Sequence, residues 1–567
     1  MSQAALPPTD AETSWWRDLV LLAVVFGALL AWRLGSAPLI NPDEGRYAEV
    51  PREMIASGDW VTPRLDGVPY FEKPPLTYWI VAAFEEALGP GEWSVRLGPA
   101  LFALGGILAS YAAARRIYGR SAGFWTAAVL GTSLLYLALG HLVTPDVPLS
   151  FLMSATLFCF ILGVREPPGA RRRMLFYGLY ASAALATLTK GLEGFLVTGA
   201  VMFLWLLVFD QWGRLRPLYL PSGAALFLAV AAPWHFLVAS RNPGWARFYF
   251  VYEHWERFTD KGHGRYQPFY FFILILIPGL FPWTGFLWPS LRDALAGGWG
   301  RRKENAEAWF FATWAGFILV FFSASQSKLI NYILPMFPAL AVLIGRWLAA
   351  VMPRPDAFAR MQAGLRTFAV LCGLLAAFLC VAVLRPGLVV RDAAQATALQ
   401  PYAFVLAAIL VVGGIRAIVP RTVTGASRGA VVAMTATLVF VVGVLAFAMP
   451  IIDVRSTKDL AVEARRLIQP GDRVYHYHAF FHDFTYYSGR VVGLVGYRDE
   501  LELQFLGAAE RKDRFIDDAE FRREWAGPGR VFAVARTGDA AKLFAEPGFH
   551  YRVLATGQHH YLFSNQP

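Results

Sequence analysis

The chain has 567 residues, of which 56% are hydrophobic, 15% aromatic and 16% charged. This apolar content is far above that of a soluble globular protein, so a soluble protein of one or two domains is excluded. The 52 Lys and Arg residues outnumber the 41 Asp and Glu residues and give a formal charge of +11. Most arginines nevertheless lie in short connections between apolar runs, as membrane topology requires, so the charge is no sign of nucleic-acid binding.

Apolar runs of about 18 to 24 residues recur from Leu19 to Met449 and then stop. Each is long enough to cross a bilayer as a helix. They predict a polytopic α-helical membrane protein with about thirteen transmembrane helices, near 19–36, 95–113, 122–140, 146–164, 173–189, 191–209, 217–239, 268–290, 307–323, 328–351, 366–385, 401–419 and 430–449. The first is predicted to be retained, because no small-residue cleavage site follows it.

Basic residues mark one side of the predicted bundle. They fall in every second connection, at 115–120, 171–173, 214–216, 301–303, 354–360 and 421–428. The positive-inside rule makes these connections cytoplasmic. The N-terminus is therefore predicted inside. The connections 37–94, 141–145, 240–267 and 323–327 and the tail from Pro450 are predicted outside, in the periplasm or its equivalent.

Residues 450–567 differ from the membrane part, 1–449, because charged residues return. Strand-like stretches at 473–477, 490–495 and 530–534 are separated by charged helical stretches, which predicts a small α/β domain. His476 and His478 share one face of the first of these strands and precede His482 and Asp483 in the sequence. This group is either a zinc site or a set of ordinary surface or interface histidines.

The connection 37–94 is too long and too rich in ionisable groups to be a simple turn. Asn41 is placed to cap a helix that has Glu44 at its third position, and Gly58 is placed to end it. The pattern predicts a short helix at the membrane surface with Asp43 and Glu44 in its first turn. These carboxylates either stabilise the helix N-terminus or are presented at the mouth of a membrane cavity.

Three further positions on the outer side combine charge with an interfacial location. Glu72 and Lys73 stand side by side in the run Tyr70–Pro75, and since adjacent side chains do not share one face they serve different partners. Lys73 either extends to lipid headgroups or binds a ligand phosphate. Asp146 is a lone carboxylate at the outer start of the fourth span, where it either stabilises the helix entry or acts in a site.

The connection 240–267 holds an unusual density of His, Arg and aromatic residues. His254 and Arg257 are three positions apart, so on a helix they share a face, where an imidazole suits a metal and a guanidinium suits a phosphate. A single histidine is also a common hydrogen-bonded structural group. Tyr332, near the start of the tenth span, is either an interface anchor or a phosphate ligand.

Carboxylates and cations therefore gather on one side of the membrane at one depth. The carboxylates are Asp43, Glu72 and Asp146, and the cations are Lys73, Lys190, Arg257 and Lys328. The cations exceed what the carboxylates need for salt bridges. This balance suits a phosphate on a long isoprenoid, whose head meets protein cations while its tail stays in hydrocarbon. A divalent metal bound by Glu72 and His254 would draw off further phosphate charge.

Four segments resemble one known family. They are PDEGRYAEVPREMIASGDWVTPRLDGVPYFEKPP in the connection 37–94, the TPD turn before the fourth span, the TKG turn at 189–191 and EHWERF in the connection 240–267. They are similar to membrane glycosyltransferases of the ArnT type, aminoarabinose transferases with the GT-C fold that are related to protein O-mannosyltransferases. The likeness covers the membrane part, about 450 residues. The tail, 450–567, resembles the family only in being a soluble domain.

The resemblance implies an enzyme that moves a sugar, 4-amino-4-deoxy-L-arabinose, from undecaprenyl phosphate to a phosphate of lipid A at the outer face of the bacterial inner membrane. This change of lipopolysaccharide favours resistance to polymyxin and cationic antimicrobial peptides. The resemblance also implies a single displacement with inversion at the anomeric carbon. We expect a monomer in contact with inner-membrane lipids.

Carried over by motif, the resemblance assigns roles to nine residues. Asp43 and Asp146 match the essential carboxylates, with Glu44 beside the first, Lys73, Arg257, Tyr332 and Tyr70 match the phosphate-binding set, and Glu72 with His254 matches a pair that binds a divalent metal, zinc, magnesium or manganese. His263 is the alternative to His254. One departure is that Gly45 and Pro51 interrupt the acidic helix, where stronger helix formers are expected.

Two other functions remain open. A protein O-glycosyltransferase that uses a polyprenyl-phosphate sugar would differ in its acceptor, a hydroxyl from which Asp43 must accept a proton. A proton-coupled lipid flippase or transporter would use Asp43 and Asp146 as proton carriers. The ionisable residues cluster at one membrane face and the two halves of the sequence show no symmetry, which argues against transport.

Overall fold

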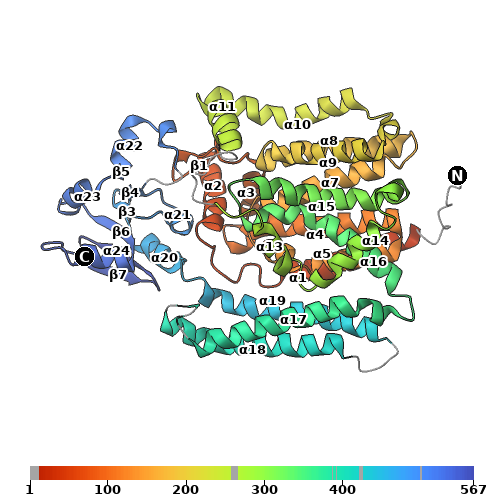
Figure 1. Cartoon of the computed structure of the whole chain (residues 1–567). Coiled ribbons are helices and arrows are strands. Elements are labelled where there is room, and N and C mark those ends of the chain that lie inside the picture. Colours follow the sequence, from red (N-terminus) through yellow and green to blue (C-terminus); the bar gives the residue numbers. More distant parts are fainter. Residues whose placement is uncertain are drawn as a thin grey trace.

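The computed structural model describes residues 12–256, 266–385, 387, 389–390, 392–419, 425–497 and 501–566. A bundle of long helices forms the larger part of the molecule, and a smaller part with a β-sheet lies beyond one end of the bundle (Figure 1). We call this end the sheet-facing end. Much of the first predicted outer connection, 37–94, lies between the bundle and the sheet (Figure 1).

Eight described helices are long and apolar enough to cross a membrane. They are α4 (Glu92–Tyr118), α7 (Asp146–Gly163), α10 (Leu220–Arg241), η4 (Trp299–Asn305) with α15 (Ala306–Ala324), η5 (Ile330–Met336) with α16 (Phe337–Val351), α17 (Ala357–Leu384), α18 (Ala393–Ile418) and α19 (Ala426–Ile452). Helices α1 (Glu12–Ala31), α5 (Arg120–Gly131), α6 (Leu134–Leu139), α8 (Ala170–Lys190) and α9 (Glu193–Phe209) overlap further predicted spans. The prediction of a polytopic helical membrane protein is confirmed, while the count of thirteen stays a prediction.

The apolar run at 268–290 is not one continuous helix. Helix α13 (Phe271–Gly279) is followed by η3 (Thr284–Phe286) and α14 (Leu287–Ala294), and the two helical pieces are bent by 109°. Pro278 lies in the last turn of α13 and Pro282 lies in the break, and a proline lacks the amide hydrogen that would continue a helix. The run is thus a broken span or a re-entrant loop, and not the continuous span that the sequence predicts.

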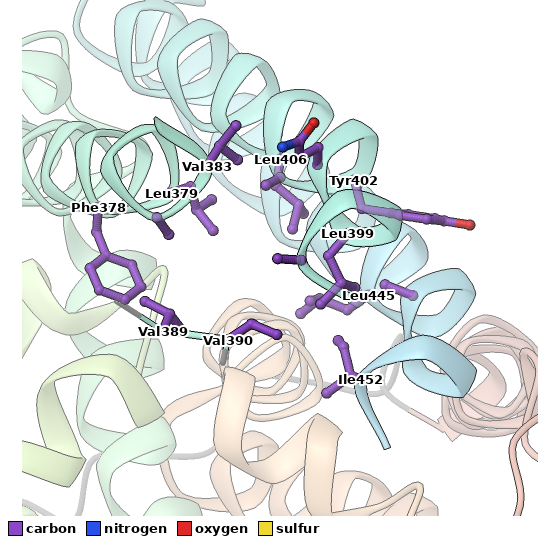
Figure 2. Close-up of a pocket in the computed structure, with 15 residues that line it drawn as sticks. Phe378, Leu379, Val383, Val389, Val390, Leu399, Tyr402, Leu406, Leu445 and Ile452 are labelled. Carbon is purple, nitrogen blue, oxygen red and sulfur yellow. The ribbon is translucent and has the colours of Figure 1, made fainter. Parts of the chain in front are cut away.

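Helices α17, α18 and α19 form a separate layer along one side of the bundle (Figure 1). Between them lies an apolar cavity of about 270 Å³. Figure 2 shows its walls, in which Phe378 and Val383 of α17 meet Leu399 and Leu406 of α18 and Ile452 of α19. Aliphatic and aromatic walls suit the hydrocarbon region of a membrane, where water offers no polar partner.

The connection 37–94 folds into four elements that lie against the C-terminal part. They are α2 (Asp43–Ser57), β1 (Arg64–Leu65), β2 (Val68–Pro69) and α3 (Leu76–Leu88). The predicted helix over the acidic pair is confirmed, and Gly58 ends it in the left-handed conformation with φ of 70°. Two expectations are wrong. Asn41 does not cap the helix, because no side-chain cap hydrogen bond forms, and α2 runs without a break through Gly45 and Pro51.

After α10 the chain continues through α11 (Trp245–Arg247) and η2 (Phe248–Glu256), a π-helical segment. Trp245 stacks on Tyr249 with ring centroids 4.9 Å apart. Both rings are buried in one cluster with Phe71 of the first connection. η2 is therefore packed against the segment that leads into Glu72 and Lys73.

The C-terminal part holds a six-stranded sheet with the order β5-β4-β3-β6-β8-β7. Strands β3 (Arg473–Tyr477), β4 (Gly493–Val495), β5 (Phe515–Ile516) and β6 (Val531–Arg536) are parallel, and β8 (His560–Ser564) and β7 (Arg552–Thr556) add an antiparallel edge. The remaining elements are α20 (Lys458–Leu467), α21 (His482–Ser488), η6 (Leu503–Phe505), α22 (Ala508–Arg514), α23 (Asp518–Trp525) and α24 (Thr537–Phe544). The three strands that the sequence predicts correspond to β3, β4 and β6.

The first connection and the C-terminal part share one hydrophobic core. Tyr47 and Met54 of α2 are buried in the same cluster as Phe484 of α21, Leu494 of β4 and Phe532 of β6. Burial of apolar surface is the dominant favourable contribution to such packing. α2 is therefore held by the C-terminal part as well as by the bundle.

Three carboxylates of the first connection also bind the C-terminal part. Asp66 Oδ2 lies 2.8 Å from Arg514 Nη2, Glu85 Oε1 accepts a 2.6 Å hydrogen bond from the Tyr486 hydroxyl, and Glu92 Oε1 accepts a 2.8 Å hydrogen bond from the Tyr487 hydroxyl. Burial raises the pKa of Glu85 to about 7, although the hydrogen bond from Tyr486 acts in the opposite direction. Burial likewise raises the pKa of Asp66 to about 7, against the charge of Arg514.

The raised pKa of Glu85 predicts a pH-dependent stability. The folded protein keeps this proton up to a pH of about 7, whereas the unfolded chain loses it near the ordinary value of 4.5. Stability from this group is thus fully present below pH 4.5 and is lost as the pH rises through 7, by about 3 kcal/mol in all.

Glu85→Gln removes the titration but keeps an acceptor for Tyr486. Unfolding of the wild type is expected at a higher denaturant concentration at pH 5 than at pH 8, and this difference should shrink in the variant. Asp66 titrates in the same direction and leaves a residual slope. An undiminished slope in the variant would show that Glu85 is not the group that responds.

Candidate site at the sheet-facing end

Asp43 is the first residue of α2 and the more open of the two predicted essential carboxylates. Its side chain is 64% exposed, and Oδ1 lies 3.6 Å from Nη2 of the buried Arg46, one helical turn later. Arg46 Nη1 donates to the hydroxyl of Tyr70 at 3.3 Å. The predicted carboxylate and the predicted phosphate ligand Tyr70 are therefore joined through one guanidinium group, and Asp43 keeps a face open to a ligand.

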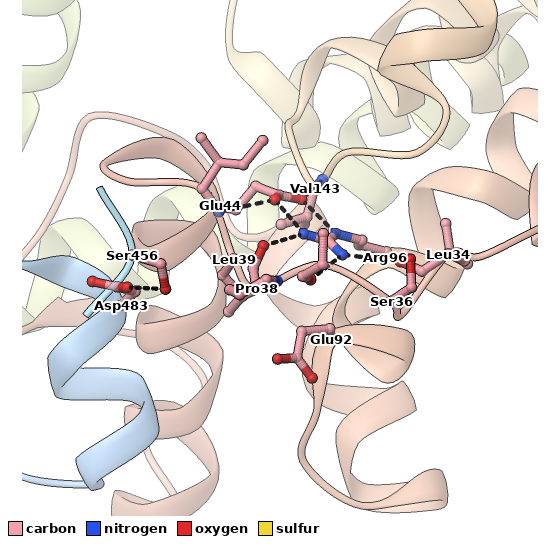
Figure 3. Close-up of polar contacts among 12 residues, drawn as sticks. Leu34, Ser36, Pro38, Leu39, Glu44, Glu92, Arg96, Val143, Ser456 and Asp483 are labelled. Carbon is pink, nitrogen blue, oxygen red and sulfur yellow. Dashed lines mark hydrogen bonds and ion pairs between the residues drawn. The ribbon is translucent and has the colours of Figure 1, made fainter. Parts of the chain in front are cut away.

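Glu44, its neighbour, is buried and fully engaged (Figure 3). Its carboxylate accepts from Arg96 Nε at 2.9 Å and from Arg96 Nη2 at 2.6 Å, and it also accepts from the backbone amides of Val143 at 2.9 Å and Ile40 at 3.1 Å. Arg96 belongs to α4 and Val143 to the turn before α7. This geometry favours a structural role for Glu44, which ties the start of α2 to the bundle, over the predicted catalytic one.

Asp146 begins α7, and both of its oxygens are taken. Oδ1 lies 2.7 Å from Lys190 Nζ at the end of α8, and Oδ2 accepts from the amide of Asn331 in η5. Lys190 Nζ also lies 3.3 Å from a carboxylate oxygen of Glu193 and 4.3 Å from the centroid of the Tyr332 ring. The structure therefore brings together the predicted residues Asp146, Lys190 and Tyr332 from three helical elements.

Tyr47 of α2 connects the two predicted essential carboxylates. Its ring stacks on Tyr78 of α3 with centroids 5.8 Å apart. Burial raises the pKa of the Tyr47 hydroxyl well above its ordinary value, and the charges of Asp43 and Asp146 both act in the same direction. The convergence of Asp43 and Asp146 on one site stays a prediction.

Lys73 lies in a second cationic position. Its Nζ donates to the backbone oxygen of Glu72 at 2.9 Å and lies 3.6 Å from Oε2 of Glu253 in η2. Burial raises the pKa of Tyr249, and the charges of Glu193 and Glu253 reinforce that rise. Glu193 lies beside Lys190 and Glu253 lies beside Lys73, so the charges of both ion pairs reach this buried tyrosine.

Three predicted residues cannot be placed. Arg257 and His263 lie outside the described residues, and of His254 only the backbone, in η2, is described. Their roles stay predictions. The geometry of Lys328 favours a structural role over ligand binding. Its Nζ donates to the backbone oxygens of Gln267, at 2.9 Å, and Ser325.

Among the described residues, no group of three or more His, Cys, Asp and Glu side chains is arranged to hold a metal ion. In the C-terminal part, His478 Nε2 lies 3.0 Å from the Asp518 carboxylate. Burial lowers the pKa of His476 well below its ordinary value, and the nearby His482 and His560 act in the same direction. These contacts favour ordinary structural histidines over the zinc site that the sequence left open.

Gly45 is a weak helix former within α2, and its surroundings explain why a glycine occupies this position. A Cβ atom at this position would lie 2.6 Å from the backbone nitrogen of Asp483 and 2.9 Å from Cβ of His482. Next to it, the Asn41 amide donates to the Asp483 carboxylate, and the Asp483 amide donates back to Asn41 Oδ1 at 3.1 Å. Close approach of α2 to α21 therefore requires a residue without a side chain.

Five residues of the site were missed from the sequence, namely Arg46, Tyr47, Arg96, Glu253 and Asn331. Helical spacing alone was enough to find Arg46, since it lies three positions after Asp43 on the predicted helix. Asn331 precedes Tyr332 directly. No local pattern points to Arg96 or Glu253, because each meets its partner only through tertiary folding.

Known proteins with similar sequences are enzymes that transfer sugars from lipid carriers. The family described as dolichyl-phosphate-mannose-protein mannosyltransferase matches residues 72–236. An undecaprenyl phosphate-alpha-4-amino-4-deoxy-L-arabinose arabinosyl transferase of Pectobacterium carotovorum is 33% identical over 337 residues, and another of Proteus mirabilis is 34% identical over 321 residues. The matches cover 59% and 56% of this chain, and the chain spans 59% and 57% of the length of these relatives.

Similarity to a solved structure extends over nearly the whole chain. The crystal structure of ArnT from Cupriavidus metallidurans bound to undecaprenyl phosphate matches with a TM-score of 0.84 and 30% sequence identity. The match covers 98% of this chain and 98% of that chain. Likeness of this extent in both sequence and fold shows that the chain belongs to the ArnT family of membrane glycosyltransferases with the GT-C fold.

Proposed function

We propose that the protein transfers 4-amino-4-deoxy-L-arabinose from undecaprenyl phosphate to a phosphate of lipid A. The observation that supports the proposal is that one end of the bundle carries both an open carboxylate, Asp43, and two largely buried cations, Lys73 and Lys190. The names of the relatives give the donor, and the related crystal structure contains the carrier lipid. Modified lipid A would favour resistance to polymyxin and cationic antimicrobial peptides.

The proposed orientation puts the sheet-facing end in the periplasm of a bacterial inner membrane. It rests on the basic connections, since Arg115 and Arg116 lie at the opposite end of α4 from Glu92, which contacts the C-terminal part. Thirteen transmembrane helices with a cytoplasmic N-terminus fit this orientation. The domains would then be a membrane domain of residues 1–449 and a periplasmic domain of residues 450–567, in a monomer.

The carrier phosphate is proposed to bind between Lys73 and Lys190, with the hydroxyls of Tyr70 and Tyr332 and with Arg257 completing its ligands. Asp146 would act through Lys190 as a positioning residue, because its two oxygens are occupied by Lys190 and Asn331. Asp43 keeps an exposed carboxylate for the sugar.

The reaction is a single displacement at the anomeric carbon. An oxygen of the lipid A phosphate forms a bond to this carbon as the bond to the carrier phosphate oxygen breaks, and the carrier phosphate leaves with the electron pair. Inversion follows from attack opposite the leaving group. The acceptor phosphate is already ionised at neutral pH, so no proton needs to be removed, and Asp43 stabilises positive charge on the sugar ring or orients its amine.

A divalent metal held by Glu72 and His254 is proposed as well. The charges of Glu253 and Glu72 both add to the burial that raises the pKa of Glu502. Such a concentration of negative charge fits a bound cation, which would withdraw charge from the carrier phosphate. One equivalent of metal is expected in the purified wild type and not in Glu72→Gln, whereas equal metal contents would contradict this assignment.

The function is tested by incubating the purified protein in detergent with the lipid-linked sugar and lipid A, followed by mass spectrometry of the lipid A. A gain of one aminoarabinose mass is expected, and transfer without a sealed membrane excludes obligate transport. In cells, the sugar should disappear from lipid A when the protein is removed. Loss of a sugar from envelope proteins, with lipid A unchanged, would instead show a protein glycosyltransferase.

A further inference from the structure

We infer that a polar cavity between η2 and η6 binds the phosphorylated sugar of the acceptor, an inference that rests on the proposed function. The cavity has a volume of about 620 Å³ and lies where the C-terminal part meets the chain after α10. One wall is built from Arg247, Phe248 and Tyr252, and the other from Glu502, Gln504 and Phe505. It is thus formed by two regions about 250 residues apart in the sequence.

The wall after α10 supplies a cation, Arg247, that no described group neutralises. Arg247 is exposed, and in the part of the chain that the structure describes its side chain donates no hydrogen bond and forms no ion pair. A guanidinium group that lines a cavity in this state suits a phosphate, which it binds through two parallel hydrogen bonds.

The opposite wall supplies groups that suit a sugar. The carboxylate of Glu502 accepts a 3.0 Å hydrogen bond from Gln504 Nε2, and both side chains carry further capacity to bond hydroxyl groups. The ring of Phe505 meets Phe248 across the cavity floor with centroids 5.7 Å apart. Aromatic rings beside a few polar groups are typical of a small-molecule pocket, in which the rings cover the apolar face of the ligand.

The cavity adjoins the reacting region. Phe505 also contacts Phe71, with ring centroids 4.9 Å apart, and Phe71 directly precedes Glu72 and Lys73. A ligand in the cavity therefore lies next to the cation that is proposed to hold the carrier phosphate.

Acceptor and donor each carry a phosphate, and the structure separates the cations available to them. Lys73 and Lys190 are held by carboxylates at the proposed donor site, whereas Arg247 lies in a separate polar cavity with one wall from the C-terminal part. The donor must keep its long isoprenoid in hydrocarbon, but the sugar of the acceptor is a water-facing headgroup. The cavity at this boundary therefore fits the acceptor.

The test uses the full-length protein in detergent and compares the wild type with Arg247→Ala. The KM for lipid A is expected to rise at least about tenfold, the effect of losing a charge-assisted hydrogen bond, while the KM for the donor stays unchanged. The matched control is Arg466→Ala, an arginine of α20 that is 73% exposed and lies outside the cavity. Arg247→Lys keeps the positive charge but cannot form two parallel hydrogen bonds. Its KM for lipid A is expected to lie between those of the wild type and Arg247→Ala.

A second measurement follows binding of lipid A to the protein without any donor, and compares it with lipid A from which the phosphates have been removed. The wild type should bind the phosphorylated form more tightly, and Arg247→Ala should lose this preference. If the wild type shows the preference but transfers no sugar, the proposed function fails and the cavity assignment stands. An unchanged preference in Arg247→Ala, or a rise in the KM for the donor alone, would overturn the assignment.

Discussion

Replacing Asp43 with asparagine is expected to lower kcat for transfer to lipid A by about 10²- to 10³-fold. The change removes the negative charge but keeps the size of the side chain, at a position that is 64% exposed and open to a ligand. Because a lipid A phosphate is already ionised at neutral pH, the remaining activity needs no general base. It should therefore persist when the pH is raised, as measured by initial rates between pH 6 and 9.

The control for this variant is Glu304→Gln. Glu304 is 58% exposed and pairs with an arginine three positions away, so it resembles Asp43 in exposure and spacing, although Arg301 is exposed and Arg46 is buried. An exposed ion pair contributes at most about 1 kcal/mol, and an asparagine at position 43 still offers an oxygen to Arg46, so both variants should unfold close to the wild type. Wild-type kcat in Asp43→Asn would contradict the role proposed for Asp43. If the variant were inactive at every pH, a hydroxyl acceptor would be favoured instead.

The sequence predicts those parts of the site that follow from local rules. The helix over Asp43 and its end at Gly58 are examples, since both depend on residues within a few positions. The place of Asp146 at the start of an apolar helix is another, since it follows from the length of the apolar run behind it. These predictions succeed because helix ends and membrane spans are properties of short segments.

Residues whose partners lie far along the chain were predicted less well. Asn41 looks like a helix cap, yet its amide binds Asp483, 442 positions away. Gly45 looks like a defect in a helix, but it gives α21 room to approach. Glu44 has the pattern of a first-turn acid, whereas its partner Arg96 lies on another helix. In each case tertiary packing decides the role, and local propensity gives no sign of it.

The C-terminal part was predicted as a separate domain, but it contacts the segment that carries Asp43. It shares a hydrophobic core with α2 and binds three carboxylates of the first connection. The start of α2, which carries Asp43, is thus fixed by the bundle through Glu44 and by the C-terminal part through Asn41. A small displacement of the bundle or of the C-terminal part would move Asp43. The C-terminal part therefore helps to position this carboxylate.

Replacing Asp146 with alanine is expected to destabilise the protein by about 3 to 5 kcal/mol, because it leaves the ammonium group of Lys190 buried without its main partner. The Lys190 side chain is only 8% exposed, and Asp146 Oδ1 lies 2.7 Å from it. Glu193, at 3.3 Å, compensates only in part. Denaturant unfolding of the purified variant measures this loss.

The double variant Asp146→Ala with Lys190→Met separates stability from function. Removing both charges leaves no buried ion, so unfolding should return towards the wild type, as for other buried ion pairs replaced by apolar side chains. Transfer should stay low, because the cation proposed to bind the carrier phosphate is gone, and the KM for the donor should rise in Lys190→Met as well. If the double variant regained both stability and transfer, the pair would serve only to hold α7 against α8. The carrier phosphate would then have to depend on the cations around Lys73 alone.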